Sequence, residues 1–170
     1  MSETKISETK TRSGFVTLLG ATNAGKSTLV NQLVGTKVSI VSHKVQTTRA
    51  LVRGIITEGD TQIVLVDTPG IFKPRRRLDR AMVSTAWSGA KDADIVLFIV
   101  DAERGFAGDA GTILDSLKDS KARNVLVLNK VDRVEPPKLL DLAGYAAQVA
   151  KFEKVFMVSA LNGSGCKDLV

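Results

Sequence analysis

The 170-residue sequence has little cysteine, histidine or tryptophan, since each occurs once. Because the single cysteine, Cys166, has no partner in the chain, an internal disulfide framework is excluded and a reducing compartment is expected. The single histidine, His43, cannot by itself build a catalytic triad or a metal site. No apolar run exceeds a strand such as Ile95–Val100, and residues 1–13 hold no apolar stretch. Neither a membrane-spanning helix nor a secretory signal is therefore expected, and the chain is predicted to be cytoplasmic.

What the sequence does contain is the composition of an ordinary globular domain. Hydrophobic residues make up 44% and charged residues 25% of the chain, and the length suits one domain. The net charge of +6 is uneven, because the first 80 residues hold 13 Lys and Arg against 6 Asp and Glu, and the remainder 11 against 12. The basic first half indicates an anionic partner; the alternative is that the charge only aids solubility.

Short β-branched runs alternate with helical patterns from Gly14 onward, which predicts an α/β fold. The expected helices are Lys26–Val34, Leu78–Ala90, Gly108–Lys118, Pro137–Lys151 and one opening near Cys166. The expected strands are Phe15–Leu19, Leu51–Thr57, Gln62–Val66, Asp94–Val100, Asn124–Leu128 and Val155–Val158.

The apolar strands indicate a sheet that helices cover on both faces. A Glu-Gly-Asp turn at residues 58–60 joins the second and third strands as a hairpin. We therefore expect a mostly parallel sheet with one antiparallel edge strand. Residues 1–13 are expected to form a flexible polar tail. Residues 14–170 are expected to form one domain, truncated in its last helix, at the front of a longer protein.

The segment from Gly20 to Ser27, GATNAGKS, fits the pattern GxxxxGK[ST] and lies between an expected strand and an expected helix. Its backbone N–H groups can curl around phosphate oxygens, and the helix N-terminus adds positive potential. Lys26 is expected to reach the β- and γ-phosphates, and the Ser27 hydroxyl to coordinate Mg²⁺. The predicted phosphate site consists of Gly20, Ala21, Thr22, Asn23, Ala24, Gly25, Lys26, Ser27 and Thr28.

Two further segments predict the remainder of the phosphate end. Asp67 ends a strand and is expected to hold Mg²⁺ through a water, while the Gly70 N–H approaches the γ-phosphate. A threonine between the first two strands is expected to close over Mg²⁺ and the γ-phosphate. The sequence does not choose between Thr47 and Thr48, and we prefer Thr48; the alternative is that both simply start a strand. The other nucleotide contacts predicted here are Thr68, Pro69 and Ile71.

The segment Asn129-Lys130-Val131-Asp132 follows another strand and indicates the base. The Asp132 carboxylate can accept hydrogen bonds from N1–H and the N2 amine of guanine, whereas adenine would leave it unpaired. Asn129 is expected to contact the purine N7 edge, and the stem of Lys130 to cover a base face. Ser159, Ala160 and Leu161 follow the last strand and are expected to present a backbone N–H to guanine O6.

The segments GATNAGKS, QTTR, DTPG, NKVD and SAL occur in an order and at spacings that resemble translation-factor-like GTPases. VSHKVQTTR, DTPGIFKPRRRLDRAM and SALNGSG are similar to the Era family, within the TrmE-Era-Der group. The resemblance spans Gly14 to Val170 and implies a Ras-like six-stranded domain that binds GTP or GDP and Mg²⁺. It also implies a role in 16S rRNA maturation and 30S ribosomal subunit assembly, with the RNA held mainly by a C-terminal KH domain that this chain lacks.

The resemblance carries expectations about the reaction as well. Lys26, Thr48 and Gly70 would act on the γ-phosphate during hydrolysis. Turnover is expected to be slow, because Ile71 stands where Ras-type enzymes place a glutamine that orients water. Asn23 is a candidate ligand for K⁺, as in TrmE-like relatives.

The remaining expectations concern partners and alternatives. The protein is expected to be monomeric and cytoplasmic, with weak peripheral association at the inner membrane. The cationic loop Lys73–Arg77 is either an RNA contact or a solvated loop. Two other functions stay open: a switch whose nucleotide state only shapes a partner surface, and an adenine-specific ATPase or kinase, against which Asp132 argues.

Overall fold

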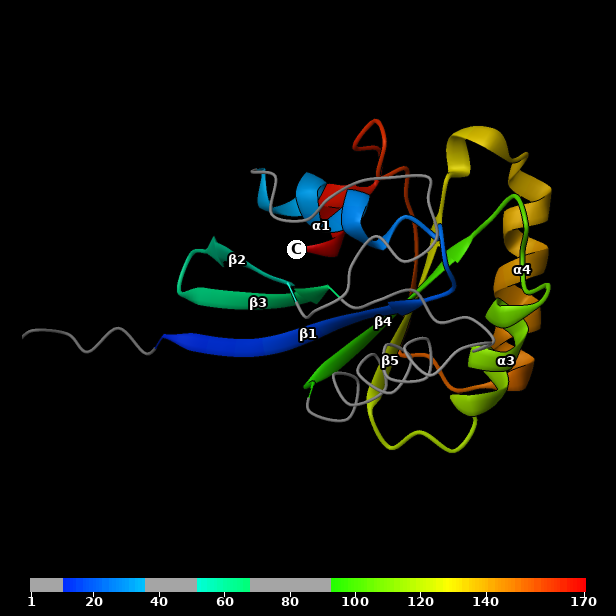
Figure 1. Ribbon diagram of the computed structural model, residues 1–170, viewed down its shortest axis with the longest axis horizontal. Coiled ribbons are helices and arrows are strands. Elements are labelled where there is room, and N and C mark those ends of the chain that lie inside the picture. The colour runs from blue at the N-terminus through cyan, green and yellow to red at the C-terminus, as the bar shows by residue number, and fades with distance from the viewer. Residues whose placement is uncertain (1–10, 36–51, 68–92) are drawn as a thin grey trace, which may run out of the picture.

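The computed structural model describes residues 11–35, 52–67 and 93–170, and a six-stranded sheet forms its centre (Figure 1). The strand order is β2-β3-β1-β4-β5-β6, and every neighbouring pair is parallel except β2 and β3. The predicted α/β class, with one antiparallel edge strand, is confirmed. The strands are β1 (Arg12–Gly20), β2 (Val52–Glu58), β3 (Thr61–Asp67), β4 (Ile95–Asp101), β5 (Arg123–Asn129) and β6 (Lys154–Met157).

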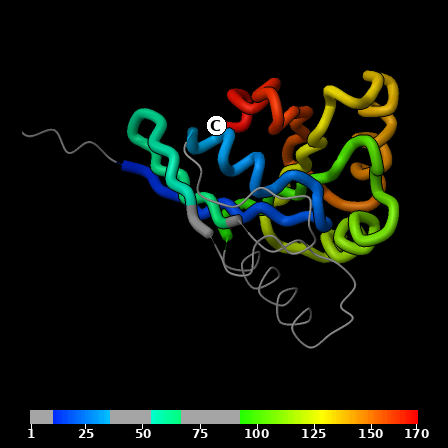
Figure 2. Tube along the Cα trace, turned by 45° about the horizontal axis from the view of Figure 1, so that its top comes forward, coloured from blue at the N-terminus to red at the C-terminus, as the bar shows by residue number. Residues whose placement is uncertain are grey.

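Two hydrophobic clusters, one on each face of the sheet, explain why the central strands are apolar throughout. Successive residues alternate between the clusters: Phe98 packs in one and Ile99 in the other, and neither side chain is exposed. Helices α3 (Asp109–Ser116) and α4 (Pro136–Val149) cover the first face. Helix α1 (Lys26–Val34) and the 3₁₀ turn η2 (Cys166–Leu169) cover the second, where Figure 2 shows them side by side.

The observed helices agree with the sequence in place and differ in extent. Helix α1 has the predicted bounds, and α4 begins one residue early because Pro136 suits the first turn of a helix. The helix predicted to open near Cys166 is the single 3₁₀ turn η2, and another such turn, η1, spans Val131–Arg133. The predicted helix Leu78–Ala90 lies outside the described residues. Of the helices that the structure describes, none has the length and apolarity to cross a membrane.

The first strand is longer than predicted. β1 begins at Arg12 instead of Phe15, because Arg12 lies opposite Thr61 in the parallel ladder and its N–H donates to the Asp60 carbonyl at 2.8 Å. Arg12 and Ser13, which the sequence assigned to a flexible tail, therefore belong to the sheet. Tail composition is polar, and only the pairing with β3 orders it.

The parallel ladder brings five strand ends to one edge of the sheet. Leu18 lies opposite Asp67, Gly20 opposite Ile99, and Asp101 opposite Asn129, so β1, β3, β4 and β5 stop at a similar level. The residues after β6 join them, because the Val131 N–H donates to the Val158 carbonyl at 3.3 Å. In open α/β sheets ligands bind in the crevice at this carboxyl edge.

Candidate nucleotide-binding site

The loop between β1 and α1 (residues 20–25) has the backbone that a phosphate cradle needs. Asn23 and Gly25 have left-handed backbones, with φ of 63° and 96°. A Cβ on Gly25 would collide with the side-chain nitrogen of Asn129, so a larger residue would displace that amide and also be strained at this φ. α1 starts directly after this glycine with no side-chain cap and no acid in its first turn. The helix N-terminus therefore keeps its positive potential for an anion.

Lys26 is the first residue of α1 and directly follows this loop. It is 6% exposed, and its ammonium donates to the carbonyls of Gly20 at 3.2 Å and Ala21 at 3.0 Å. Backbone carbonyls are weaker acceptors for an ammonium than phosphate oxygens. A nucleotide phosphate can therefore take over these hydrogen bonds without moving the lysine far.

The donor set of the cradle fits a phosphate and Mg²⁺. The Thr22 hydroxyl oxygen is buried and has no hydrogen-bond partner among the described residues. A buried hydroxyl without a partner is costly, and an oxygen ligand would relieve that cost. Ser27 follows Lys26 and is half-buried. Asp67, the last residue of β3, lies opposite Leu18 in the ladder, two residues before the end of β1. A hydroxyl and a carboxylate are hard oxygen ligands of the kind that Mg²⁺ prefers.

Asn129 connects the phosphate loop to the segment after β6. It is 2% exposed, its Nδ2 donates to the Ala24 carbonyl at 2.9 Å, and its Oδ1 accepts the Ala160 N–H at 2.9 Å. An amide nitrogen carries two hydrogens, and this one shows one acceptor in the described part of the chain. The second hydrogen can serve the predicted purine N7 edge.

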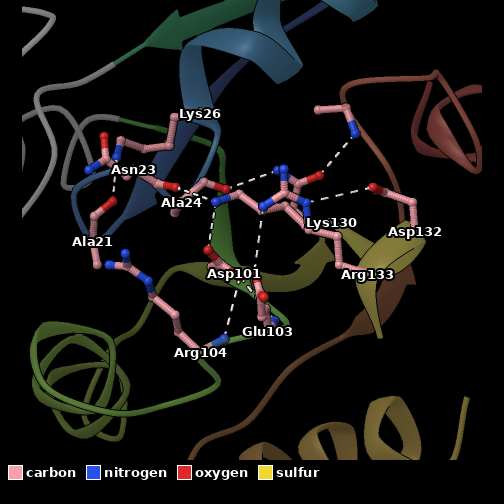
Figure 3. Close-up of polar contacts among 12 residues, drawn as sticks. Ala21, Asn23, Ala24, Lys26, Asp101, Glu103, Arg104, Lys130, Asp132 and Arg133 are labelled. Carbon is pink, nitrogen blue, oxygen red and sulfur yellow. Dashed lines mark hydrogen bonds and ion pairs between the residues drawn. The ribbon is translucent and has the colours of Figure 1, made fainter. Parts of the chain in front are cut away.

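Lys130 makes a second connection, and Figure 3 shows it between the phosphate loop and β4. Its ammonium donates to the Asn23 carbonyl at 3.0 Å and to Asp101 Oδ2 at 2.6 Å. Asp101 is 8% exposed at the end of β4. Asp101 is not among the residues predicted from the sequence, although it ends an apolar strand as Asp67 does.

Asp132 and Leu161 offer the groups expected to recognise the base. Asp132 lies in η1, where the only ion pair of its carboxylate among the described residues is a loose one of 4.0 Å to Arg133. The Ala160 N–H is already donated to Asn129, so it is not free for guanine O6. Leu161 is 74% exposed, and its N–H has no acceptor within residues 11–35, 52–67 and 93–170. Of the predicted triplet, Leu161 is therefore the one with a free donor.

Cys166 lies beneath this last loop. Its Sγ is 3.7 Å from the Ser159 carbonyl, and burial raises the pKa of the thiol. The thiol packs as a small apolar group of η2 in the second hydrophobic cluster.

Several predicted site residues lie outside the described residues. They are Thr47, Thr48, Thr68, Pro69, Gly70 and Ile71, together with His43 and the loop Lys73–Arg77. The predicted site residues that the structure does describe gather at one edge of the sheet. They are residues 20–28, 129–132 and 159–161.

Comparisons with known proteins agree with this geometry. The model of one protein family, described as "50S ribosome-binding GTPase", matches residues 15–130. GTPase Era of Brucella suis biovar 1 (strain 1330) is 72% identical over 161 residues, which are 95% of this chain and 52% of that protein. The chain thus spans about half the length of the curated relatives it matches.

Two solved structures are also similar. Era in complex with MgGDPNP and nucleotides 1506–1542 of 16S ribosomal RNA superposes with a TM-score of 0.87 at 34% identity, over 94% of this chain and 55% of that one. An Aquifex aeolicus Era variant bound to GDP and AlF4⁻ has a TM-score of 0.86 at 34% identity, over 93% and 55% of the two chains. The Ras-like sheet expected from the sequence is the fold these structures share.

Proposed function

Because the chain belongs to the family of 50S ribosome-binding GTPases, we propose that it binds GTP and GDP with Mg²⁺ and hydrolyses GTP slowly, as a molecular switch. The observation that carries the proposal is Asn129, whose one side chain connects the phosphate loop to the base-recognition segment after β6. A ligand with both a phosphate tail and a purine base matches that arrangement. MgGDPNP is bound in the similar Era structure.

Base recognition falls to three groups. The Asp132 carboxylate accepts the two adjacent donors of guanine, the Leu161 N–H donates to O6, and Asn129 donates to N7. Adenine presents an unprotonated N1 and an amine where guanine has N1–H and O6. It would leave Asp132 and Leu161 mismatched, at a cost of about 1–3 kcal/mol for each buried polar group left unpaired.

The phosphate end performs the hydrolysis. Lys26 exchanges the carbonyls of Gly20 and Ala21 for β- and γ-phosphate oxygens, and it offsets charge that develops as water attacks in line. Ser27, Thr48 and Asp67 would hold Mg²⁺, which when bound neutralises phosphate charge. The Gly70 N–H would donate to the γ-phosphate. No side chain of this set is a committed base, and Ile71 cannot orient water, so turnover is slow.

Competition between nucleotides tests the base assignment. Fluorescent N-methylanthraniloyl-GDP bound to the 170-residue chain should be displaced by unlabelled GDP and not by the same concentration of ADP. Asp132→Asn should exchange guanine preference for xanthine, because xanthine replaces the N2 amine with an acceptor. Displacement by ADP at a concentration comparable to GDP would contradict guanine specificity and favour an adenine-specific ATPase or kinase.

A K⁺ ion held by Asn23 is a further part of the proposal. Asn23 lies exposed at the tip of the phosphate loop with a φ of 63°, close to where the phosphates would lie. A monovalent cation there would supply the positive charge that an arginine finger gives in other GTPases. GTP turnover should be faster in KCl than in NaCl, and Asn23→Ala should remove that difference. Equal turnover in the two salts would contradict the role of K⁺.

The proposed biological role is 16S rRNA maturation and 30S subunit assembly, because Era is solved with a piece of 16S rRNA. We extend the proposal to a monomeric, cytoplasmic protein with weak peripheral association at the inner membrane, as the family resemblance implies. An RNA oligonucleotide with the sequence of that 16S segment should bind weakly, and changing Arg75, Arg76 and Arg77 to alanine should weaken it further. Unchanged binding by the triple variant would leave this loop without an RNA contact.

A further inference from the structure

We propose that Asp101 is a positioning residue that holds the turn after β5, residues 129–132, against the phosphate loop through Lys130, and so slows nucleotide release. The inference rests on the proposed binding of guanine nucleotides and deepens it. It assigns a role to a residue outside the motif segments that the sequence identifies. Its structural basis is the contact of 2.6 Å between Lys130 Nζ and Asp101 Oδ2.

Asp101 is itself held in place. Its Oδ1 accepts the N–H groups of Glu103 at 2.9 Å and Arg104 at 3.4 Å. Its backbone carbonyl accepts the Gly105 N–H at 2.8 Å, which closes the turn after β4. One carboxylate oxygen is thus used to fix the turn, and the other is left to face Lys130. The side chain is 9% exposed, so it cannot rotate into solvent without disrupting that turn.

Lys130 needs such a partner. Its backbone is left-handed, with a φ of 65°, a conformation that is strained for a non-glycine residue. Its side chain is 28% exposed, so water is available as an alternative partner for the ammonium. The Asp101 carboxylate holds the ammonium away from water and over the Asn23 carbonyl, 3.0 Å distant.

The consequence for binding follows from where these residues lie. Asn23 belongs to the loop that grips phosphates, and Lys130 is two residues before Asp132, which recognises the base. A link between the phosphate loop and the turn after β5 fixes the distance between the phosphate end and the base end of the nucleotide site. Without it, the contact of Asn129 with Ala24 is the remaining described link between them, and either one opens more readily while the other still holds the ligand. Release through partly open states is faster, and most affinity differences between related complexes arise in the dissociation rate.

Dissociation of N-methylanthraniloyl-GDP from the 170-residue chain, chased with excess GDP, tests the proposal. We expect Asp101→Asn to release nucleotide about tenfold faster: if the amide oxygen keeps the turn contacts of Oδ1, the amide NH2, a donor, faces the Lys130 ammonium and the charge-assisted hydrogen bond is lost. Lys130→Met should accelerate release by at least as much, and the double variant should be no faster than Lys130→Met alone. That non-additivity is the signature of a residue that acts through another. A purely structural role would give independent effects.

Controls separate this result from trivial ones. Arg123 and Glu153 form an exposed ion pair at the opposite end of β5 from Lys130. Glu153→Gln removes the charge of one partner and should leave the rate of nucleotide release unchanged. If Asp101→Asn does not fold, Asp101→Ser keeps an acceptor for the turn while it cannot reach Lys130. Wild-type release rates for the Asp101 variants, or additive effects in the double variant, would overturn the inference. Failure of the wild type to bind labelled GDP would instead overturn the proposed function.

Discussion

At the scale of single residues, the site depends on contacts between loops that are far apart in the sequence. Asn129 lies 105 positions from Ala24 and 31 from Ala160, yet it hydrogen-bonds the backbone of both. Gly25 is the position against which the Asn129 amide packs, and it has no room for a side chain. These residues therefore contribute to the fold even before any nucleotide binds.

Asn129→Ala should lower the free energy of unfolding of the nucleotide-free protein by about 2–6 kcal/mol. It leaves the Ala24 carbonyl and the Ala160 N–H buried without a partner, at about 1–3 kcal/mol each. Urea unfolding followed by circular dichroism measures the change. Asn162→Ala is the control, because Asn162 is exposed and its side chain accepts a single N–H, that of Ser164, among the residues that the structure describes. Equal losses in the two variants would contradict the connecting role of Asn129.

Gly25→Ala and Gly35→Ala form a matched pair at the two ends of α1. Both glycines have left-handed backbones, with φ of 96° and 70°, so alanine is strained at either position by about 1–2 kcal/mol. A Cβ at Gly35 meets open space, whereas one at Gly25 collides with Asn129. We expect Gly25→Ala to abolish binding of labelled GDP and Gly35→Ala to keep it. Comparable binding by both would show that the collision is relieved cheaply.

The sequence identified the motif residues but not all the residues that hold them. Lys26, Asn129, Lys130 and Asp132 were predicted from patterns, because each pattern is contiguous along the chain. Asp101 was missed, since its partner Lys130 is 29 positions away and nothing local marks the pair. Tertiary contacts of this kind become visible only when the strands are aligned.

At the scale of elements, the local sequence pattern sets the bounds of some elements and strand pairing sets those of others. Helix α1 begins and ends at glycines with left-handed backbones, so its bounds follow from the sequence itself. The start of β1 depends on the β1–β3 ladder, which no local pattern reveals. The turn η2 is held in place by packing: its Cys166 is 5% exposed and lies in the second hydrophobic cluster.

The thiol of Cys166 should therefore react with Ellman's reagent at pH 8 at least about tenfold more slowly in the native protein than in urea, because reaction needs an exposed thiolate. Burial raises the pKa of the thiol in the folded state. The folded state thus keeps its proton at a pH where the unfolded thiol has lost it. This contribution to stability is present below the unfolded pKa and is lost as the pH rises above it. Equal reaction rates in native and unfolded protein would contradict the buried position.

At the scale of the whole molecule, the net positive charge comes from residues outside the described ranges. Residues 11–35, 52–67 and 93–170 contain 13 Lys and Arg against 14 Asp and Glu, although the chain as a whole carries +6. The excess therefore belongs to residues 1–10, 36–51 and 68–92 of the sequence. Any electrostatic attraction to RNA should depend on these segments and weaken with salt.

Nucleotide binding should stabilise the whole domain, because the site unites the ends of β1, β3, β5 and the segment after β6. A ligand that binds only the folded state adds about 4 kcal/mol at a thousand times its dissociation constant. The melting temperature should therefore rise with GDP and Mg²⁺, and not with ADP and Mg²⁺. Thermal unfolding followed by circular dichroism measures this shift. An equal shift with ADP would contradict guanine specificity.

The sequence by itself determined which residues are expected to carry the chemistry: a phosphate loop from Gly20 to Ser27, an acid at Asp67 for Mg²⁺, and a carboxylate at Asp132 for guanine. These follow because phosphate cradling and base recognition need particular residue types at short, fixed spacings. Only the tertiary structure decided how the pieces hold each other, through Asn129 on Ala24 and Ala160, and Asp101 on Lys130. The physical reason is that parallel strands bring together ends that lie tens of residues apart, and the register that aligns them is set by packing on both faces of the sheet.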